Sequence, residues 1–146
     1  MKIVLAPDSF KGSLSSDQAA LAMEKGVRDV FPLADIVRIP VSDGGEGLVD
    51  AFLAFHQGQK IIVTTKGPNG NPVSSFYGLT NDNTAVIEMA ASAGLALAGK
   101  NPDPAKATTY GVGELMKDAV KQRAKNIILG LGGSATNDAG CGIASC

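Results

Sequence analysis

The sequence has little net charge, few cysteines and no long apolar run, and each shortage excludes a class of protein. Its 146 residues include 13 Lys or Arg and 14 Asp or Glu, so the formal net charge is -1. Such a balance provides no broad basic field for nucleic acid or an anionic membrane. No stretch approaches the roughly 20 apolar residues that span a bilayer, and the first apolar run, residues 3–6, is too short for a signal peptide. We therefore expect a cytoplasmic protein whose partners are small molecules or proteins.

The two cysteines and the one histidine form no metal or redox motif. Cys141 and Cys146 are five positions apart, a spacing that is typical of no zinc or redox site, so we interpret them as core thiols. His56 lies late in a stretch with helical spacing, where a surface role or an interaction with the helix C-terminus is favoured over catalysis. The hydrophobic share of 45% and the charged share of 18% are typical of a folded globular chain.

Alternating apolar runs predict an α/β fold in the first part of the chain. Strands are expected at residues 3–6, 36–39 and 60–65, with helices between them, and Ser15 and Gln18 form a plausible capping box for the first helix. This order predicts a Rossmann-like layer with a mostly parallel sheet. Residues 66–72 are dense in turn formers, so we place the first domain at residues 1–66.

Residues 67–146 are expected to begin a second α/β domain. Short strands are predicted at residues 73–79, 84–88 and 126–131, and a helix is predicted to start at Thr108 or Thr109. A Gly-rich turn then opens one more helix, and the chain stops where that helix would begin. Since an isolated helical turn is unfavourable, we expect a truncated chain with an incomplete second domain.

A polar loop follows the first predicted strand, at a place where open α/β sheets bind ligands. It contains Asp8, Ser9 and Lys11. A lysine can neutralise phosphate charge, and an aspartate can hold a metal or accept a proton. The alternative is a solvated turn with a helix cap.

A second polar loop, residues 42–47, follows the second predicted strand. Asp43 and Glu46 flank the pair Gly44 and Gly45. Glu46 could be only a helix cap, because the helix dipole favours carboxylates there, whereas the glycines would let a ligand approach backbone N–H groups. Both loops leave the same edge of the predicted sheet, so we expect them to face one cleft.

A third loop, residues 130–138, lies between a predicted strand and a predicted helix, where backbone N–H groups can bind an anion. No Gly-Lys-Ser/Thr follows, so it is not a Walker A loop, but it matches the weak dinucleotide pattern Gly-x-Gly-x-x-Ala. Its candidate ligand-binding residues are Gly132, Gly133, Ser134, Thr136, Asn137 and Asp138.

Two further positions allow two interpretations each. Glu88, at the end of a predicted strand, is either a site residue or an edge charge. Residues 108–114 are either another binding loop or a helix start, and cap chemistry favours the helix start.

Together, and in this order, these loops resemble the type I glycerate kinase family. The matching stretches are residues 6–12, 40–47, 67–68, 87–90, 108–113 and 130–138, so the chain resembles the N-terminal part of that family. The resemblance implies an ATP-dependent phosphotransferase with an alcohol group as acceptor, which converts glycerate to phosphoglycerate in organic acid metabolism. It also implies two α/β domains with the active site between them.

The resemblance also implies roles for single residues, and magnesium is expected because kinases use it to neutralise phosphate charge. Lys11 would clamp a phosphate or carboxylate, Asp43 would be the base or a metal ligand, and Glu46 would support Asp43 or bind metal. The glycines and hydroxyls of the third loop would cradle an anion, with Asp8 and Asp138 as second-rank candidates. Two alternatives stay open: a dinucleotide-binding oxidoreductase built on residues 130–135, and a non-catalytic ligand-binding fragment.

Overall fold

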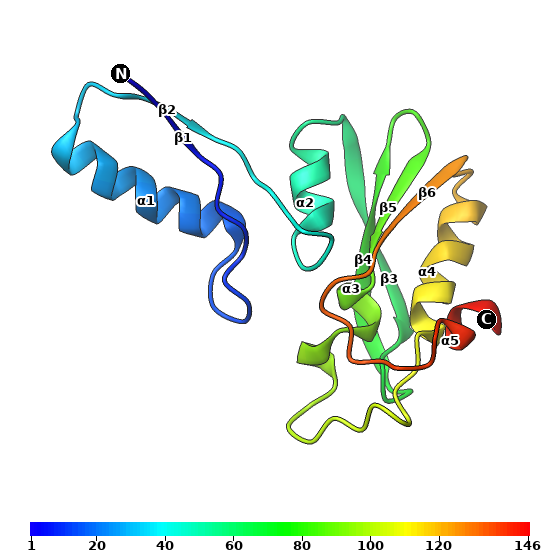
Figure 1. The fold of residues 1–146 in the computed structure, drawn as a ribbon. Coiled ribbons are helices and arrows are strands. Elements are labelled where there is room, and N and C mark those ends of the chain that lie inside the picture. Colours follow the sequence, from blue (N-terminus) through cyan, green and yellow to red (C-terminus); the bar gives the residue numbers. More distant parts are fainter.

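The chain, described over residues 1–146 by a computed structural model, begins with a β-α-β unit (Figure 1). Strands β1 (Lys2–Leu5) and β2 (Asp35–Arg38) pair in parallel, and α1 (Ser16–Val30) connects them. The predicted capping box is present, because the Ser15 hydroxyl accepts a hydrogen bond from Gln18 N and the Gln18 side chain accepts one from Ser15 N. The predicted α/β class and this parallel pair are confirmed.

A second, four-stranded sheet forms the larger part of the molecule. Its strand order is β3-β4-β5-β6, in which β4 pairs antiparallel with both β3 and β5, and β6 pairs parallel with β5. Helix α2 packs on one face of this sheet and α4 on the other (Figure 1). These elements are β3 (Gly58–Lys66), β4 (Pro72–Thr80), β5 (Thr84–Glu88), β6 (Asn126–Gly130), α2 (Leu48–Leu53), α3 (Ala90–Ala93), η1 (Leu95–Leu97), α4 (Tyr110–Lys121) and α5 (Cys141–Ala144).

The position of β3 corrects the predicted organisation of the first 66 residues. All of β3 pairs antiparallel with β4, from Gly58 opposite Thr80 to Lys66 opposite Pro72, so β3 does not belong to the sheet of β1 and β2. The turn formers after residue 66 close a hairpin, in which Gly67 N donates to Asn71 O at 2.7 Å. A boundary after residue 66 would separate two paired strands, and we therefore propose that the division lies in the loop between β2 and α2.

The hydrophobic core lies between the four-stranded sheet and α4. Tyr77, Ile87, Val112 and Leu115 are fully buried there, and every residue of β5 is buried. Alternate residues of β4 face the two helices: the Tyr77 hydroxyl donates to Asp118 on α4, whereas Gly78 lies against α2. The opposite face of β4 and β5 therefore packs against α2, which places the loop that precedes α2 beside the sheet.

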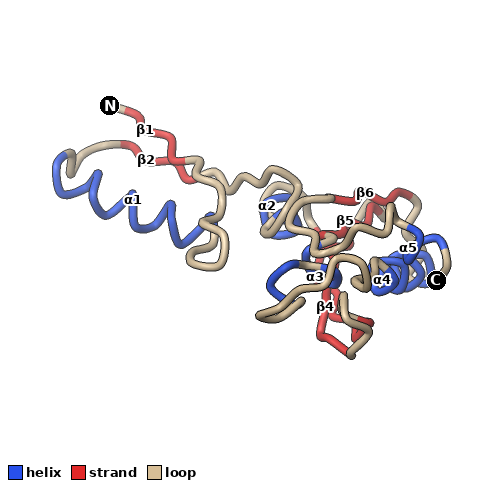
Figure 2. The backbone as a smooth tube through the Cα atoms, turned by 60° about the horizontal axis from the view of Figure 1, so that its bottom comes forward, coloured by secondary structure: helices blue, strands red, loops and turns tan.

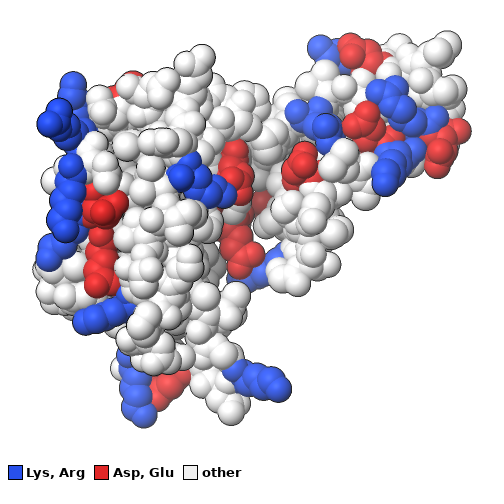
Figure 3. Space-filling view, turned by 180° about the vertical axis from the view of Figure 1, so that it is seen from behind, with Lys and Arg blue, Asp and Glu red and all other residues white.

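The β1–β2–α1 unit is less well covered and extends to one side of the larger sheet in both backbone views (Figures 1 and 2). Leu33 is 96% exposed, Val30 68% and Val4 53%. On the face shown in Figure 3, acidic and basic side chains are interspersed on both parts of the molecule. None of the helices combines the length and apolar character that a membrane crossing requires.

Candidate active site

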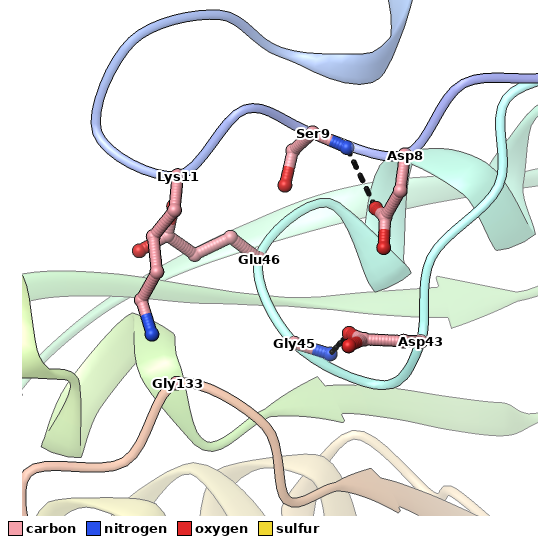
Figure 4. Close-up of a pocket in the computed structure, with 7 residues that line it drawn as sticks. All are labelled: Asp8, Ser9, Lys11, Asp43, Gly45, Glu46 and Gly133. Carbon is pink, nitrogen blue, oxygen red and sulfur yellow. Dashed lines mark hydrogen bonds between the residues drawn. The ribbon is translucent and has the colours of Figure 1, made fainter.

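Three loops from the two sheets meet at one small polar cavity (Figure 4). Its volume of about 130 Å³ is well above the roughly 10–15 Å³ that one water requires. No apolar side chain lines it, and three carboxylates and one ammonium belong to its wall. The lining residues, all of which were predicted as candidates, are Asp8, Ser9, Lys11, Asp43, Gly45, Glu46 and Gly133.

The loop after β1 folds back on itself and presents Lys11. Phe10 N donates to Leu14 O at 2.8 Å and Leu14 N donates to Phe10 O at 3.0 Å, with Gly12 at a positive φ of 71° between them. Asp8 accepts a hydrogen bond from Ser9 N at 2.6 Å. Lys11 makes no ion pair, and its side chain extends toward Gly133 in Figure 4. Its ammonium is therefore available to an anionic ligand.

A buried hydroxyl at the start of α1 ties the first loop to the second. Ser16 donates to Pro7 O at 2.7 Å and accepts from Val41 N at 3.4 Å. Ser16 is 8% exposed and was not among the predicted site residues. Its position within the capping motif indicates that the hydroxyl lies at a helix start. The local sequence does not indicate that the hydroxyl binds two different loops.

The loop after β2 presents two carboxylates. Asp43 Oδ1 accepts a hydrogen bond from Gly45 N at 3.1 Å, which folds the loop into a tight turn, while Asp43 Oδ2 has no partner in the protein. Glu46 makes no hydrogen bond or ion pair, and the N-cap of α2 is Gly47, so Glu46 does not act as a helix cap. One Asp43 oxygen and the whole Glu46 carboxylate are thus free to bind a ligand, a proton or a metal.

The glycines of the second and third loops allow the backbones of these two loops to lie in direct contact. Gly132 N donates to Gly44 O at 3.0 Å, and a Cβ added to Gly132 would lie 2.6 Å from Gly45 Cα. Gly44 also has a positive φ of 96°, which other residues rarely adopt. We predicted that these glycines admit a ligand to the backbone, but their principal contact is with each other. Only Gly45 and Gly133 of this group line the cavity.

The rest of the third loop is held within the protein. Gly133 O accepts from Leu95 N at 2.9 Å, Ala135 N donates to Ala93 O at 2.9 Å, and Thr136 N donates to the Ser134 hydroxyl at 3.0 Å. The Ser134 and Thr136 hydroxyls bind each other at 2.7 Å. Ala135 N and Thr136 N therefore have partners within the protein, and Gly133 is the residue of this loop that lines the cavity. Ser134, Thr136 and Asn137 lie outside the cavity lining.

Asp138 also lies outside the cavity lining and links α4 to α5. Its carboxylate accepts from Thr109 N at 2.8 Å, from the Thr109 hydroxyl, and from Gly140 N and Gly142 N at 3.1 Å. The Thr109 hydroxyl also accepts from Ile143 N at 3.1 Å, so it does not cap α4 with its side chain. Burial opposes ionisation of Asp138, but these hydrogen bonds outweigh it and hold its pKa below the usual range. The second-rank candidate Asp138 thus uses its carboxylate in contacts within the protein, and a ligand-binding role is not favoured for it.

Glu88, at the carboxyl end of β5, is a buried carboxylate that contacts the helix behind the second loop. It is 3% exposed, and its Oε1 accepts from Val49 N at 2.8 Å. Burial raises the pKa of Glu88, while the backbone N–H groups of Val49 and Gly47 act in the opposite direction. The edge-charge interpretation of Glu88 is wrong, because the side chain is enclosed. An acidic residue that ends an otherwise apolar strand was the only sequence signal for it.

The third loop lacks the structural context of a dinucleotide fingerprint. In that fingerprint the glycine pattern opens a helix directly after the strand. Here β6 ends at Gly130 and α5 begins only at Cys141, so the pattern over residues 130–135 lies in an extended loop. The oxidoreductase alternative has no support in this geometry.

Comparison with known proteins gives one consistent result. The family model described as "Glycerate kinase family" matches residues 3–146. Glycerate 2-kinase of Escherichia coli (strain K12) is 50% identical over 145 residues, which cover 98% of this chain and 38% of that protein. Glycerate kinase of Bacillus subtilis (strain 168) is 49% identical over 145 residues, with the same coverage. The chain thus spans less than two-fifths of the length of these relatives.

A solved structure has the same fold. It is the crystal structure of a protein from Salmonella typhimurium LT2 that is provisionally named glycerate kinase 2. Its TM-score is 0.76 at 46% sequence identity, and the match covers 99% of this chain and 39% of that one. The match includes all three loops around the cavity.

Proposed function

This chain belongs to the glycerate kinase family, and we propose on that premise that the whole protein transfers the γ-phosphoryl group of ATP to a hydroxyl of glycerate. The observation that carries this proposal is the cavity itself, where Lys11, Asp43 and Glu46 from two loops face Gly133 from a third. Since the chain covers 38% of the length of its relatives, the remainder of the enzyme would contribute the other groups that the reaction needs.

Asp43 is the proposed general base. Phosphoryl transfer depends on positioning and on charge neutralisation more than on covalent chemistry. As the glycerate oxygen bonds to the γ-phosphorus and the bond to the ADP oxygen breaks, the hydroxyl proton would pass to Asp43. Its Oδ2 has no partner in the protein, and the hydrogen bond from Gly45 N to Oδ1 holds the carboxylate in place. Lys11 would neutralise the transferred phosphoryl group or the glycerate carboxylate.

The carboxylates of the cavity fit a magnesium ion that arrives with ATP. Magnesium in kinases usually takes one or two carboxylates together with substrate phosphates and water. Asp8 and Glu46 are the residues that would hold it, and no group of three or more acidic, His or Cys side chains is arranged to hold a metal by itself. The ion would supply charge neutralisation for the phosphates.

The size of the cavity favours the small substrate over the nucleotide. Its volume of about 130 Å³ is below the 300–1,000 Å³ of sites for drug-sized ligands. We therefore assign glycerate and the γ-phosphoryl group to the cavity and the adenosine to a surface outside it. Because ATP is the donor, the expected compartment is the cytoplasm.

A coupled assay of ADP release by the whole protein tests this function. We expect release that requires both glycerate and magnesium. Release that is independent of glycerate, or that occurs only with a different hydroxy acid, would contradict the substrate assignment. Thermal stabilisation by glycerate with no turnover would instead favour the non-catalytic ligand-binding alternative.

A further inference from the structure

Glu88 is an enclosed carboxylate to which the proposed chemistry assigns no part. The other residues of β5 are Thr84, Ala85, Val86 and Ile87, so the strand is otherwise nearly apolar. A buried ionised group is costly unless it is paired or hydrogen-bonded. An apolar side chain would fill the same place without this cost, and packing alone therefore does not explain a carboxylate.

The group that Glu88 binds is a buried backbone N–H at the N-terminal end of α2. Helix α2 starts after Gly47, whose left-handed φ of 89° ends the second loop, and no side chain of that loop caps the helix. Glu88 reaches from β5 and accepts from Val49 N at 2.8 Å. It thus supplies the acceptor that a local N-cap residue would normally provide.

The neighbouring strand holds the other side of the same loop. Glu88 lies opposite Gly130 in the parallel pairing of β5 with β6, and Met89 N donates to Gly130 O at 2.9 Å. Two residues beyond Gly130, Gly132 N donates to Gly44 O at 3.0 Å. The ends of β5 and β6 therefore hold the loop at two points, one on each side of Glu46.

We propose that Glu88 is a positioning residue, which anchors α2 and so directs Glu46 and Asp43 into the cavity. The catalytic consequence rests on the proposed function, whereas the anchoring rests on contacts alone. The charged groups around Glu88 are Asp50 on α2, which opposes its ionisation, and Lys60 on β3, which favours it. These two pair with each other at 2.6 Å, so the hydrogen bond to Val49 N is the specific contact that Glu88 makes.

Three variants of the whole protein test this role. Glu88→Ala removes the acceptor, while Glu88→Gln keeps an oxygen that can accept from Val49 N. Tyr77→Phe is the matched control, because it also removes the side-chain hydrogen bond of a buried residue in the same sheet, the one to Asp118 at 2.9 Å, but on the side of α4. Amide hydrogen exchange over residues 44–49 and steady-state kinetics are measured for each. If Glu88→Ala does not fold, Glu88→Asp, which withdraws the carboxylate, takes its place.

We expect Glu88→Ala to accelerate exchange over residues 44–49 by roughly tenfold or more and to lower kcat by a similar factor. The KM for ATP should stay within about twofold, and Glu88→Gln should recover most of kcat. Unchanged exchange over these residues, equal acceleration in Tyr77→Phe, or unchanged kcat would each overturn the positioning role. If the unsubstituted protein does not phosphorylate glycerate, the proposed function is refuted. Accelerated exchange in Glu88→Ala would still support the anchoring of α2 in that case.

Discussion

The contact between Gly132 and the loop after β2 is predicted to tolerate no methyl group. In Gly132→Ala, the new Cβ would lie 2.6 Å from Gly45 Cα and 2.7 Å from Gly45 N. Ordinary contact begins at 3.4 Å, so the first distance is 0.8 Å too short. Both atoms belong to backbone, and the clash can be relieved only by moving the loop that carries Asp43 and Glu46.

The expected magnitude follows from this displacement. Inserting a methyl group into well-packed structure costs about 1–3 kcal/mol. A shift of about 1 Å at a reacting group can lower a rate by roughly 10². We therefore expect Gly132→Ala to lower the free energy of unfolding by about 1–3 kcal/mol and to lower kcat by one to two orders of magnitude.

Urea unfolding and kcat of the whole protein measure the two effects. Gly26→Ala is the matched control, because it adds the same methyl group within α1, where nothing beyond the adjacent helix backbone lies within 4 Å of the added Cβ. That control should stabilise the protein by about 0.5–1 kcal/mol, since alanine favours the helix more than glycine. If Gly132→Ala matches the unsubstituted protein in both measurements, the close approach of these backbones is not what shapes the cavity.

Two further predictions concern stability. The pKa of Asp138 is lowered in the folded state. Its stabilising contribution is therefore present above the unfolded pKa of about 4 and is lost as pH falls through the folded pKa. Asp138→Asn should lower the urea midpoint at pH 7 but not in acid, and an equal decrease of the midpoint at both pH values would refute the assignment. The 146-residue chain alone should self-associate through exposed apolar residues such as Leu33 and Val30. Light scattering should show less association for Leu33→Ser than for the unsubstituted chain. A monodisperse unsubstituted chain would contradict this expectation.

Local signals predicted the elements of the chain well. The run from Thr84 to Glu88 and the capping box at Ser15 and Gln18 depend on neighbouring residues, and both are present in the structure. The convergence of the first two loops also followed from the rule that ligand-binding loops leave one edge of a parallel sheet. Six candidate residues of these two loops consequently line one cavity, together with Gly133 of the third loop.

Long-range partners could not be predicted in the same way. The pattern of residues 60–65 predicts a strand but does not distinguish a parallel neighbour from an antiparallel one. Strand β3 pairs with β4 through a hairpin, and turn formers such as those of this hairpin are also typical of a domain boundary. Thr109 has the chemistry of a helix cap, yet its hydroxyl binds Asp138, which is 29 positions away. Glu88 likewise finds Val49 at a separation of 39 positions. Each of these partners is set by the tertiary fold.

The kcat of Asp43→Asn in the whole protein tests most directly the claim that this cavity is where the phosphoryl group is transferred. Asparagine keeps an oxygen that can accept from Gly45 N and removes the proposed base. Asp103→Asn is the matched control, because Asp103 Oδ1 accepts from Ala105 N at 3.1 Å, as Asp43 Oδ1 does from Gly45 N, but on an exposed loop outside the cavity. We expect kcat for glycerate to fall by roughly 10² or more in Asp43→Asn and to stay unchanged in Asp103→Asn. A kcat within a few-fold of the unsubstituted protein, together with a lower Tm, would show that Asp43 only shapes its turn and would contradict the account.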